Sequence, residues 1–447
     1  MSDDDYSRVV IAARFAAAPS PDPSGTSWLP LPFWLYGVPM AIFGDSLMVA
    51  RVVAFVLGVA SALLVWGAAL VLGLTPVTAL LAALGAALLP YGAWLSVATV
   101  PEAPCAALIL FGVVSLARSE GRLRLAGSFA LGAACFCRYD AWAPAAVFAA
   151  ISAVQAVRTK RRELGLAALV ATGPIALWLL HGVVRHGDAL FFVARVNQYQ
   201  AALGRPPLGI FRASIDTLGA IVRFEPELAA VTGVALLFSV GKTRWPFSRA
   251  ALGPVVALTA LVAFLIAAAA RGSSATHHPE RSLLPVYWFL ALLAAGLLAK
   301  LADAGRGGRW VPALAVPLAF AGNLWLRPSV RDTFAQRSEE EQVGNLLRSI
   351  GASRVALDTN DYGYFAVQAA LGYGKSFPLY ELDPRKRAEP RPATTPELAA
   401  RLRSSGATWL VISQNRSELA RPLGRPLAAT SSLTVIELEQ QLLGAAH

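Results

Sequence analysis

The chain has 447 residues, of which 56% are hydrophobic and 15% charged, and its formal net charge is +11 at pH 7. This composition is too apolar for an ordinary soluble protein and too polar for a chain that lies in a membrane throughout. The positive charge does not indicate nucleic-acid binding, because most basic clusters stand between apolar stretches, where membrane topology accounts for them.

The first fifty residues open on an acidic run, Asp3-Asp4-Asp5. Residues 7–18 carry apolar positions at helical spacing, and a Pro- and Trp-rich stretch at 28–32 leads into an amphipathic segment that ends at Phe43. Aromatic and amphipathic segments of this kind suit the level of the lipid headgroups. We therefore expect the aspartates to lie against a membrane surface; the alternative is a solvated acidic N-terminus.

Ten apolar segments are then expected to span the membrane, near residues 51–73, 76–96, 103–117, 125–137, 141–157, 164–184, 228–241, 250–270, 282–299 and 310–326. A helix rises about 1.5 Å per residue, so a hydrocarbon core of about 30 Å needs roughly 20 residues. Segments 51–73, 250–270 and 282–299 meet this length best. Segments 125–137 and 228–241 are short, and are expected to be tilted, extended by flanking residues or partly re-entrant.

Four basic clusters fix the inner side, because positive residues resist translocation. They are Arg118/Arg122/Arg124, Arg158/Lys160/Arg161/Arg162, Lys242/Arg244/Arg249 and Lys300/Arg306/Arg309. Threading outward from them predicts a multi-pass protein of the cell membrane with residues 331–447 outside. The same parity places residues 1–50 outside, so we expect either that the short acidic N-terminus is translocated by itself or that a further membrane helix precedes Met1.

Residues 331–447 contain no spanning stretch and regain charged and polar residues. A helix is expected at 339–350, and short buried strands at Arg354–Asp358, Thr408–Ser413 and Leu433–Leu438. The run Asp383–Pro396 is expected to be a surface loop. The predicted fold class is mainly α: a polytopic transmembrane bundle over residues 1–330, followed by a small extracytoplasmic α/β domain over 331–447.

Three charged residues stand at the outer ends of spans, where charge is costly and is therefore a candidate for function: Glu102, Arg138 and Arg281. Glu102 could instead be a helix N-terminal carboxylate favoured by the macrodipole by about 0.3–1 kcal/mol. Arg138 could be an interfacial cation paired with Asp140.

The run from His277 to Glu280 raises the question of a metal site, but two adjacent histidines and one carboxylate lack both a metalloprotease spacing and a third ligand. The three cysteines, Cys105, Cys135 and Cys137, lie in apolar segments and read as buried, inert thiols. We expect no metal and no cofactor.

Taken together, these residues resemble the GT-C superfamily of membrane glycosyltransferases, and most closely its branch of protein O-mannosyltransferases and lipid A aminoarabinose transferases. The matching motifs, in order, are Asp3-Asp4-Asp5-Tyr6, Trp28-Leu29-Pro30-Leu31-Pro32, Phe43-Gly44-Asp45, Pro101-Glu102, Arg138-Tyr139-Asp140-Ala141-Trp142 and Arg281-Ser282-Leu283-Leu284-Pro285. The likeness covers roughly residues 3–300. The family normally has a membrane helix before the acidic loop, which this sequence lacks.

The resemblance implies an inverting hexosyl- or pentosyltransferase at the outer face of the membrane. It would move a sugar from a polyprenyl phosphate or diphosphate carrier to a lipid, glycan or protein hydroxyl. The chemistry requires a base for the acceptor hydroxyl, for which Asp3 or Asp4 is the candidate. Cations must stabilise the leaving phosphate.

We assign that second role to Arg138 and Arg281, with His277 and His278 as weaker candidates, and expect Glu102 to orient the acceptor or the catalytic loop. The expected partners are the polyprenyl-linked donor, the acceptor and the lipid bilayer. The alternative function is a polytopic transporter or lipid flippase, although transporters place polar residues near the midplane of broken helices.

Overall fold

The computed structural model describes residues 3–202, 204, 207–239, 251–272, 278–303, 310–327, 336–383 and 390–439. The chain divides into two compact units. The bundle unit comprises Ser24–Pro32 and Ala54–Asp332, and the terminal unit comprises Met1–Pro23, Phe33–Val53 and Thr333–His447. The predicted fold class is confirmed: the chain is mainly helical, with a small sheet near its C-terminus.

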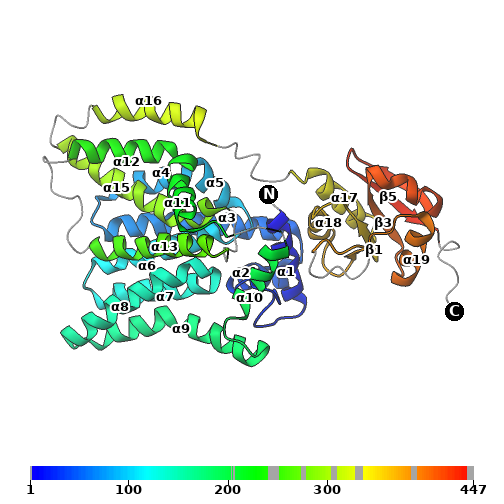
Figure 1. Cartoon of the computed structure of the whole chain (residues 1–447), viewed down its shortest axis with the longest axis horizontal. Helices are drawn as coiled ribbons and strands as arrows, with labels where there is room; N and C mark the ends of the chain where they lie inside the picture. Colours follow the sequence, from blue (N-terminus) through cyan, green and yellow to red (C-terminus); the bar gives the residue numbers. More distant parts are fainter. Residues whose placement is uncertain are drawn as a thin grey trace. The chain divides into compact units, whose positions relative to one another are not determined.

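The bundle unit is built from long apolar helices, several of which run side by side (Figure 1). The helices from the second apolar segment onward are α4 (Pro76–Leu88), α5 (Pro90–Val97), α6 (Glu102–Val114), α7 (Gly121–Cys137), α8 (Trp142–Thr159), α9 (Arg162–His186), α10 (Phe191–Ala202), α11 (Ile210–Phe224), α12 (Pro226–Ser239), α13 (Leu252–Ala270), α14 (Pro279–Ser282), α15 (Leu284–Asp303) and α16 (Trp310–Trp325). Before them, α3 runs over Leu47–Val71. Each of the ten predicted segments falls on one of these helices or on a pair of them.

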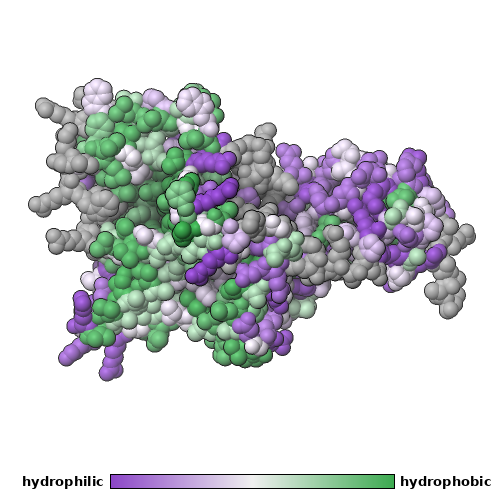
Figure 2. Space-filling view, in the orientation of Figure 1, coloured by the Kyte–Doolittle hydropathy of each residue, from purple (hydrophilic) through white to green (hydrophobic). Residues whose placement is uncertain are grey.

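Within the described residues, five helical segments are long and apolar enough to cross a membrane: Leu47–Val71, Tyr139–Thr159, Arg162–His186, Leu252–Ala270 and Leu284–Asp303. A sixth candidate is the pair α4 and α5, which is bent by 77° at its break. Hydrophobic residues cover much of the visible surface of these helices, whereas hydrophilic residues dominate the visible face of the C-terminal α/β fold (Figure 2). The chain is an integral membrane protein. The count of ten spans is not confirmed, because α6, α12 and α16 are apolar but shorter than one crossing requires.

Small residues let neighbouring helices of the bundle approach closely. A Cβ on Gly112 of α6 would lie 2.9 Å from the carbonyl oxygen of Gly127 on α7. A Cβ on Gly132 of α7 would lie 2.9 Å from the carbonyl oxygen of Val170 on α9. In lipid, van der Waals packing at small-residue contacts takes the place of the hydrophobic drive between helices. These glycines therefore fix how tightly α6, α7 and α9 pack.

The C-terminal part of the terminal unit is a five-stranded mixed sheet in the order β2-β1-β3-β5-β4. Its elements are α17 (Ser338–Ser349), β1 (Val355–Asp358), α18 (Tyr364–Leu371), β2 (Ser376–Pro378), α19 (Thr395–Ser405), β3 (Trp409–Ser413), α20 (Ser417–Ala420), β4 (Gly424–Ala429) and β5 (Leu433–Leu438). Strands β2, β1 and β3 are parallel, while β5 pairs antiparallel with β3 and β4. The predicted helix and the three predicted strands are confirmed. The predicted loop at Asp383–Pro396 ends earlier than expected, since α19 begins at Thr395.

Each face of this sheet has its own hydrophobic core. One core joins α17 and α18 to β1, β3 and β5, through residues such as Leu347, Val367 and Val411. The other joins α19 and the segment around α20 to the opposite face, through residues such as Leu402, Leu410 and Ala420. The sheet is therefore a layer between two sets of helices.

Two N-terminal helices, α1 (Asp3–Ala17) and α2 (Leu31–Phe43), confirm the helical segments predicted there. Within the terminal unit, α1 packs on α18. Asp3 forms a bidentate ion pair with Arg337, with Nε–Oδ1 and Nη2–Oδ2 distances of 2.8 and 2.9 Å. Glu341 of α17 accepts hydrogen bonds from Tyr6 and Arg51. Charged contacts therefore tie the N-terminal segment to the first helix of the C-terminal fold.

Candidate active site

Arg138 is the centre of a buried polar network in the bundle unit. It follows the last residue of α7, in extended backbone, and its side chain is 17% exposed. Its Nη1 donates to Glu102 at 2.8 Å, its Nε to Asp140 at 3.0 Å and its Nη2 to the hydroxyl of Ser282 at 2.8 Å. Burial alone lowers the pKa of Arg138, but the carboxylates of Asp140 and Glu102 outweigh it and raise that pKa above its ordinary value. The guanidinium is therefore held in its charged form.

The elements around this network explain its geometry. Glu102 opens α6 directly after Pro101, where a carboxylate in the first turn complements the helix dipole. Ser282 ends α14, a single turn that starts at Pro279. Helix ends from three separate parts of the sequence therefore converge on one guanidinium.

A second set of polar contacts adjoins the first through neighbouring residues of α14. Tyr91 of α5 donates its hydroxyl to Glu280 Oε1 at 3.2 Å and also makes a side-chain hydrogen bond with Arg281. Glu280 is 2% exposed and receives a further contact from His278 Nδ1 at 2.9 Å. Because Arg281 and Ser282 are consecutive, the Arg138 network and the Tyr91–Glu280 contacts form one polar cluster.

The break between α4 and α5 is held by a carboxylate. Glu225, 1% exposed, accepts the backbone N–H of Tyr91 at 3.2 Å and pairs with Arg327 at 3.0 Å. The N–H groups at the start of α5 have no side-chain cap from Leu89, so Glu225 serves as a cap from a distant part of the chain. Burial raises the pKa of Glu225 to about 7, although Arg327 and the backbone N–H groups oppose that rise.

The polar cluster borders a large cavity of the bundle unit, with a volume of about 1090 Å³. Its lining includes His278 and Glu280, three charged residues of α11 and an aliphatic wall. The charged residues of α11 are Arg212, Asp216 and Arg223, and the wall includes Leu208, Ile215, Val222, Leu265 and Ala269. The cavity thus offers cationic groups and an apolar surface to one ligand.

The predicted site residues fall into three groups. Glu102, Arg138, Arg281 and His278 come together in the bundle unit. Asp3 and Asp4 belong to the terminal unit, where Asp3 pairs with Arg337 and Asp4 is exposed in the first turn of α1. His277 lies outside the described residues.

Sequence reasoning missed Tyr91, Ser282 and Glu225, which complete the cluster. Tyr91 is 189 residues from its partner Glu280, and Ser282 is 144 residues from Arg138. Of these three residues, only Glu225 had a local sequence signal: it directly precedes Pro226, and a proline often begins a helix, as it does in α12.

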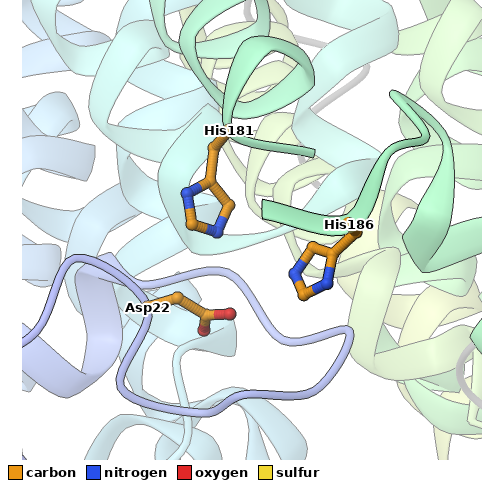
Figure 3. A group of neighbouring side chains, drawn as sticks. All are labelled: Asp22, His181 and His186. Atoms are coloured by element: carbon orange, nitrogen blue, oxygen red, sulfur yellow. The ribbon is translucent and has the colours of Figure 1, made fainter. Parts of the chain in front are cut away.

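Two further imidazoles lie at the C-terminal end of α9. Figure 3 draws His181 and His186, whose ring centroids are 5.8 Å apart. His181 stacks on Trp178, and His186 stacks on Phe191. Asp22, also drawn in Figure 3, is a residue of the terminal unit. Each imidazole therefore packs against an aromatic ring.

No family model matches the chain, and no curated protein matches it by sequence. Among solved structures it is similar to ArnT from Cupriavidus metallidurans bound to undecaprenyl phosphate, with a TM-score of 0.65 at 14% identity, over 99% of this chain and 94% of that chain. The apo form of the same ArnT gives a TM-score of 0.62 at 13% identity, over 98% of this chain and 94% of that chain.

An oligosaccharyltransferase from Archaeoglobus fulgidus, in complex with Zn and sulfate, reaches a TM-score of 0.46 and adds no weight. At these identities the likeness is one of fold. The chain has the fold of ArnT, which agrees with the resemblance named from the motifs.

Proposed function

We propose that this protein transfers a sugar from a polyprenyl phosphate or diphosphate carrier to a hydroxyl acceptor at the outer face of the membrane. The observation that carries the proposal is the buried cluster in which Arg138 pairs with Glu102 and Arg281 contacts Tyr91, beside a cavity with both charged and apolar walls. The similar ArnT structure holds undecaprenyl phosphate, a lipid that likewise has a charged group and an apolar chain.

The cavity suits such a carrier. Its aliphatic residues on α11 and α13 would contact the isoprenoid chain, and Arg212 and Arg223 of α11, which also line it, offer cations to the phosphate. Arg138 spends three of its five N–H groups on the contacts described above, which leaves donors for an anion. Donors held in a site of low dielectric stabilise developing negative charge more than water does.

In the proposed step, an aspartate takes the proton of the acceptor hydroxyl, and the acceptor oxygen forms a bond to the anomeric carbon. The bond from that carbon to the carrier phosphate breaks, and the phosphate leaves with the electron pair beside Arg138 and Arg281. Direct displacement inverts the anomeric centre. Asp4 is the better base of the two candidates, because both oxygens of Asp3 already accept hydrogen bonds from Arg337.

The test uses the purified full chain in lipid nanodiscs, with a panel of sugars linked to undecaprenyl phosphate and membrane extracts as acceptors. We expect transfer by the wild type, and a loss of at least about 100-fold in Asp4→Asn, since an amide keeps the shape but cannot take the proton. Asp303→Asn, an exposed aspartate at the end of α15, is the matched control.

Measurement of donor binding distinguishes the role of the base from that of the arginine that binds the phosphate. It should stay near the wild-type value in Asp4→Asn and fall about 10- to 100-fold in Arg138→Ala, which removes a charge-assisted contact. Full transfer in the Asp3/Asp4→Asn double variant would remove the base assignment. Movement of labelled donor across a vesicle without any transfer would instead favour the transporter.

A further inference from the structure

The C-terminal sheet has a topological switch point between β1 and β3. These strands are parallel neighbours, with Asp358 at the end of β1 paired to Ile412 near the end of β3. The chain leaves β1 toward α18 on one face of the sheet, and leaves β3 toward α20 on the opposite face. In open sheets of this kind, ligands bind outside the carboxyl ends of the strands where the connections diverge.

Charged groups gather at this point. Asp358 is fully buried, and its carboxylate pairs with Arg391 Nε at 2.6 Å and with Arg416 Nη2 at 3.2 Å. Arg391 also donates to the backbone oxygen of Asp358 and, at 2.8 Å, to Asn360 Oδ1. The ion-pair cluster itself, one carboxylate with two guanidiniums, carries a net charge of +1.

Arg416 retains donors that the fold does not use. Its Nη2 serves Asp358 and the carbonyl of Pro392, while its buried Nε finds no acceptor among the residues that the structure describes. The side chain is nevertheless 18% exposed, so solvent reaches part of the guanidinium. The exposed part of the guanidinium can make the charge-assisted contact by which arginine binds carboxylates and phosphates.

Two amides and one aromatic ring complete the arrangement. Asn360 Nδ2 donates to Asn415 Oδ1 at 3.0 Å, and both residues are exposed at the ends of the two strands. Amides both donate and accept, which matches neighbouring hydroxyl groups. Tyr380 follows β2, and its ring lies 6.0 Å from the guanidinium carbon of Arg391, so an aromatic face stands at the same edge.

We propose that the carboxyl ends of β1 and β3 form a binding site for a saccharide that carries an anionic group. Arg416 would contact the carboxylate or phosphate of the ligand, Asn360 and Asn415 its hydroxyls, and Tyr380 its apolar face. The site lies wholly within the C-terminal fold and does not depend on the proposed transferase activity.

The test is ligand-observed NMR on the full chain in nanodiscs, with glucuronate, glucose 6-phosphate and glucose as probes. At least one charged probe should bind saturably and about 10- to 100-fold more tightly than glucose, as expected for a charge-assisted contact. The better of the two charged probes identifies the anionic group as carboxylate or phosphate.

Arg416→Gln should remove the preference for the charged probe, and Asn415→Ala should weaken every probe that binds. Arg425→Gln, an exposed arginine on β4, is the matched control and should bind as the wild type does. Asp4→Asn should also retain binding, which separates this site from the transfer step. Because Asn415 is exposed, its variant keeps the test decisive even if Arg416→Gln disturbs the fold.

The absence of saturable binding by both charged probes would overturn the proposal. So would wild-type discrimination between glucuronate and glucose in Arg416→Gln.

Discussion

The bundle and the C-terminal sheet bury opposite arrangements of charge. In the bundle, one guanidinium, Arg138, lies between two carboxylates, Glu102 and Asp140. In the sheet, one carboxylate, Asp358, lies between two guanidiniums. If Arg138 is removed, the remaining carboxylates of Glu102 and Asp140 are short and only 5–6% exposed, so they stay buried. If Asp358 is removed, the two remaining arginines have long side chains that can turn toward water. The bundle should therefore tolerate the loss of its central charge less well than the sheet.

Loss of Arg138 should give the largest effect. Arg138→Ala leaves Glu102 and Asp140 buried without their counter-charge, which costs about 3–5 kcal/mol of stability. A thiol-reactive dye measures this, because the three cysteines of the chain are all free, buried and in the bundle. The dye should react at a lower temperature in Arg138→Ala. Exposed Arg118→Ala is the control, and an equal shift in both variants would contradict the argument.

The second prediction concerns pH. Since burial raises the pKa of Glu225 to about 7 from its ordinary 4.5, the folded bundle binds this proton more tightly than the unfolded chain does. The stabilising effect is complete below about pH 4.5 and is lost as pH rises through 7, a change of order 3 kcal/mol. The Tm of the wild type should therefore fall relative to that of Glu225→Gln between pH 5 and 8.

Glu227→Gln serves as the control for that experiment, since it also removes a partner of Arg327 but leaves Glu225 in place. A wild-type Tm that rises relative to that of Glu225→Gln between pH 5 and 8 would reverse the sign and exclude this account.

Loss of Asp358, the central charge of the sheet, should lower the free energy of unfolding less than loss of Arg138 does. Asp358→Asn keeps the shape of the side chain, and Arg391 and Arg416 can turn toward solvent, so we expect a loss of about 1.5–3 kcal/mol. Hydrogen exchange of the amides in β1 and β3 measures it locally. Glu418→Gln, which breaks an exposed ion pair with Arg421, should leave exchange unchanged. If Asp358→Asn proves more damaging than Arg138→Ala, the comparison fails.

The smallest expected effect concerns the N-terminal cap of α19. Thr394 and Glu397 form a capping box at the start of α19. Thr394→Ala should destabilise that helix by about 1 kcal/mol, seen as faster hydrogen exchange over residues 395–405. Ser404→Ala, near the other end of α19, removes a hydroxyl without touching the cap and should exchange as the wild type does.

The sequence predicted the elements whose signal is local. Long apolar runs identified the helices of the bundle, and Val- and Ile-rich runs identified β1, β3 and β5. Strand β2 has only three residues, and β4 contains Gly424 and Pro426 and is mostly exposed, so neither shows a buried-strand pattern. Helix α11 was missed because Arg212, Asp216 and Arg223 interrupt its apolar positions.

In the candidate site, too, only the residues with a local sequence signal were predicted. Charges at span ends marked Glu102, Arg138 and Arg281, because an isolated charge there stands out against apolar surroundings. Tyr91 and Ser282 carry no such contrast, because a tyrosine and a serine are ordinary at a membrane interface, and Glu225 gave only the weak local signal of a glutamate before a proline. Only long-range packing shows that they complete the network.

The spacing of Arg138 from its partners has a consequence for synthesis. Asp140 is two residues away and Glu102 is 36 residues away, whereas Ser282 follows 144 residues later. A charge entering the membrane alone is expensive, so the hairpin of α6 and α7 can be inserted with its guanidinium already paired to both carboxylates. The segment that carries Ser282 is synthesised later and packs against an ion pair that has already formed. The site therefore assembles in two steps.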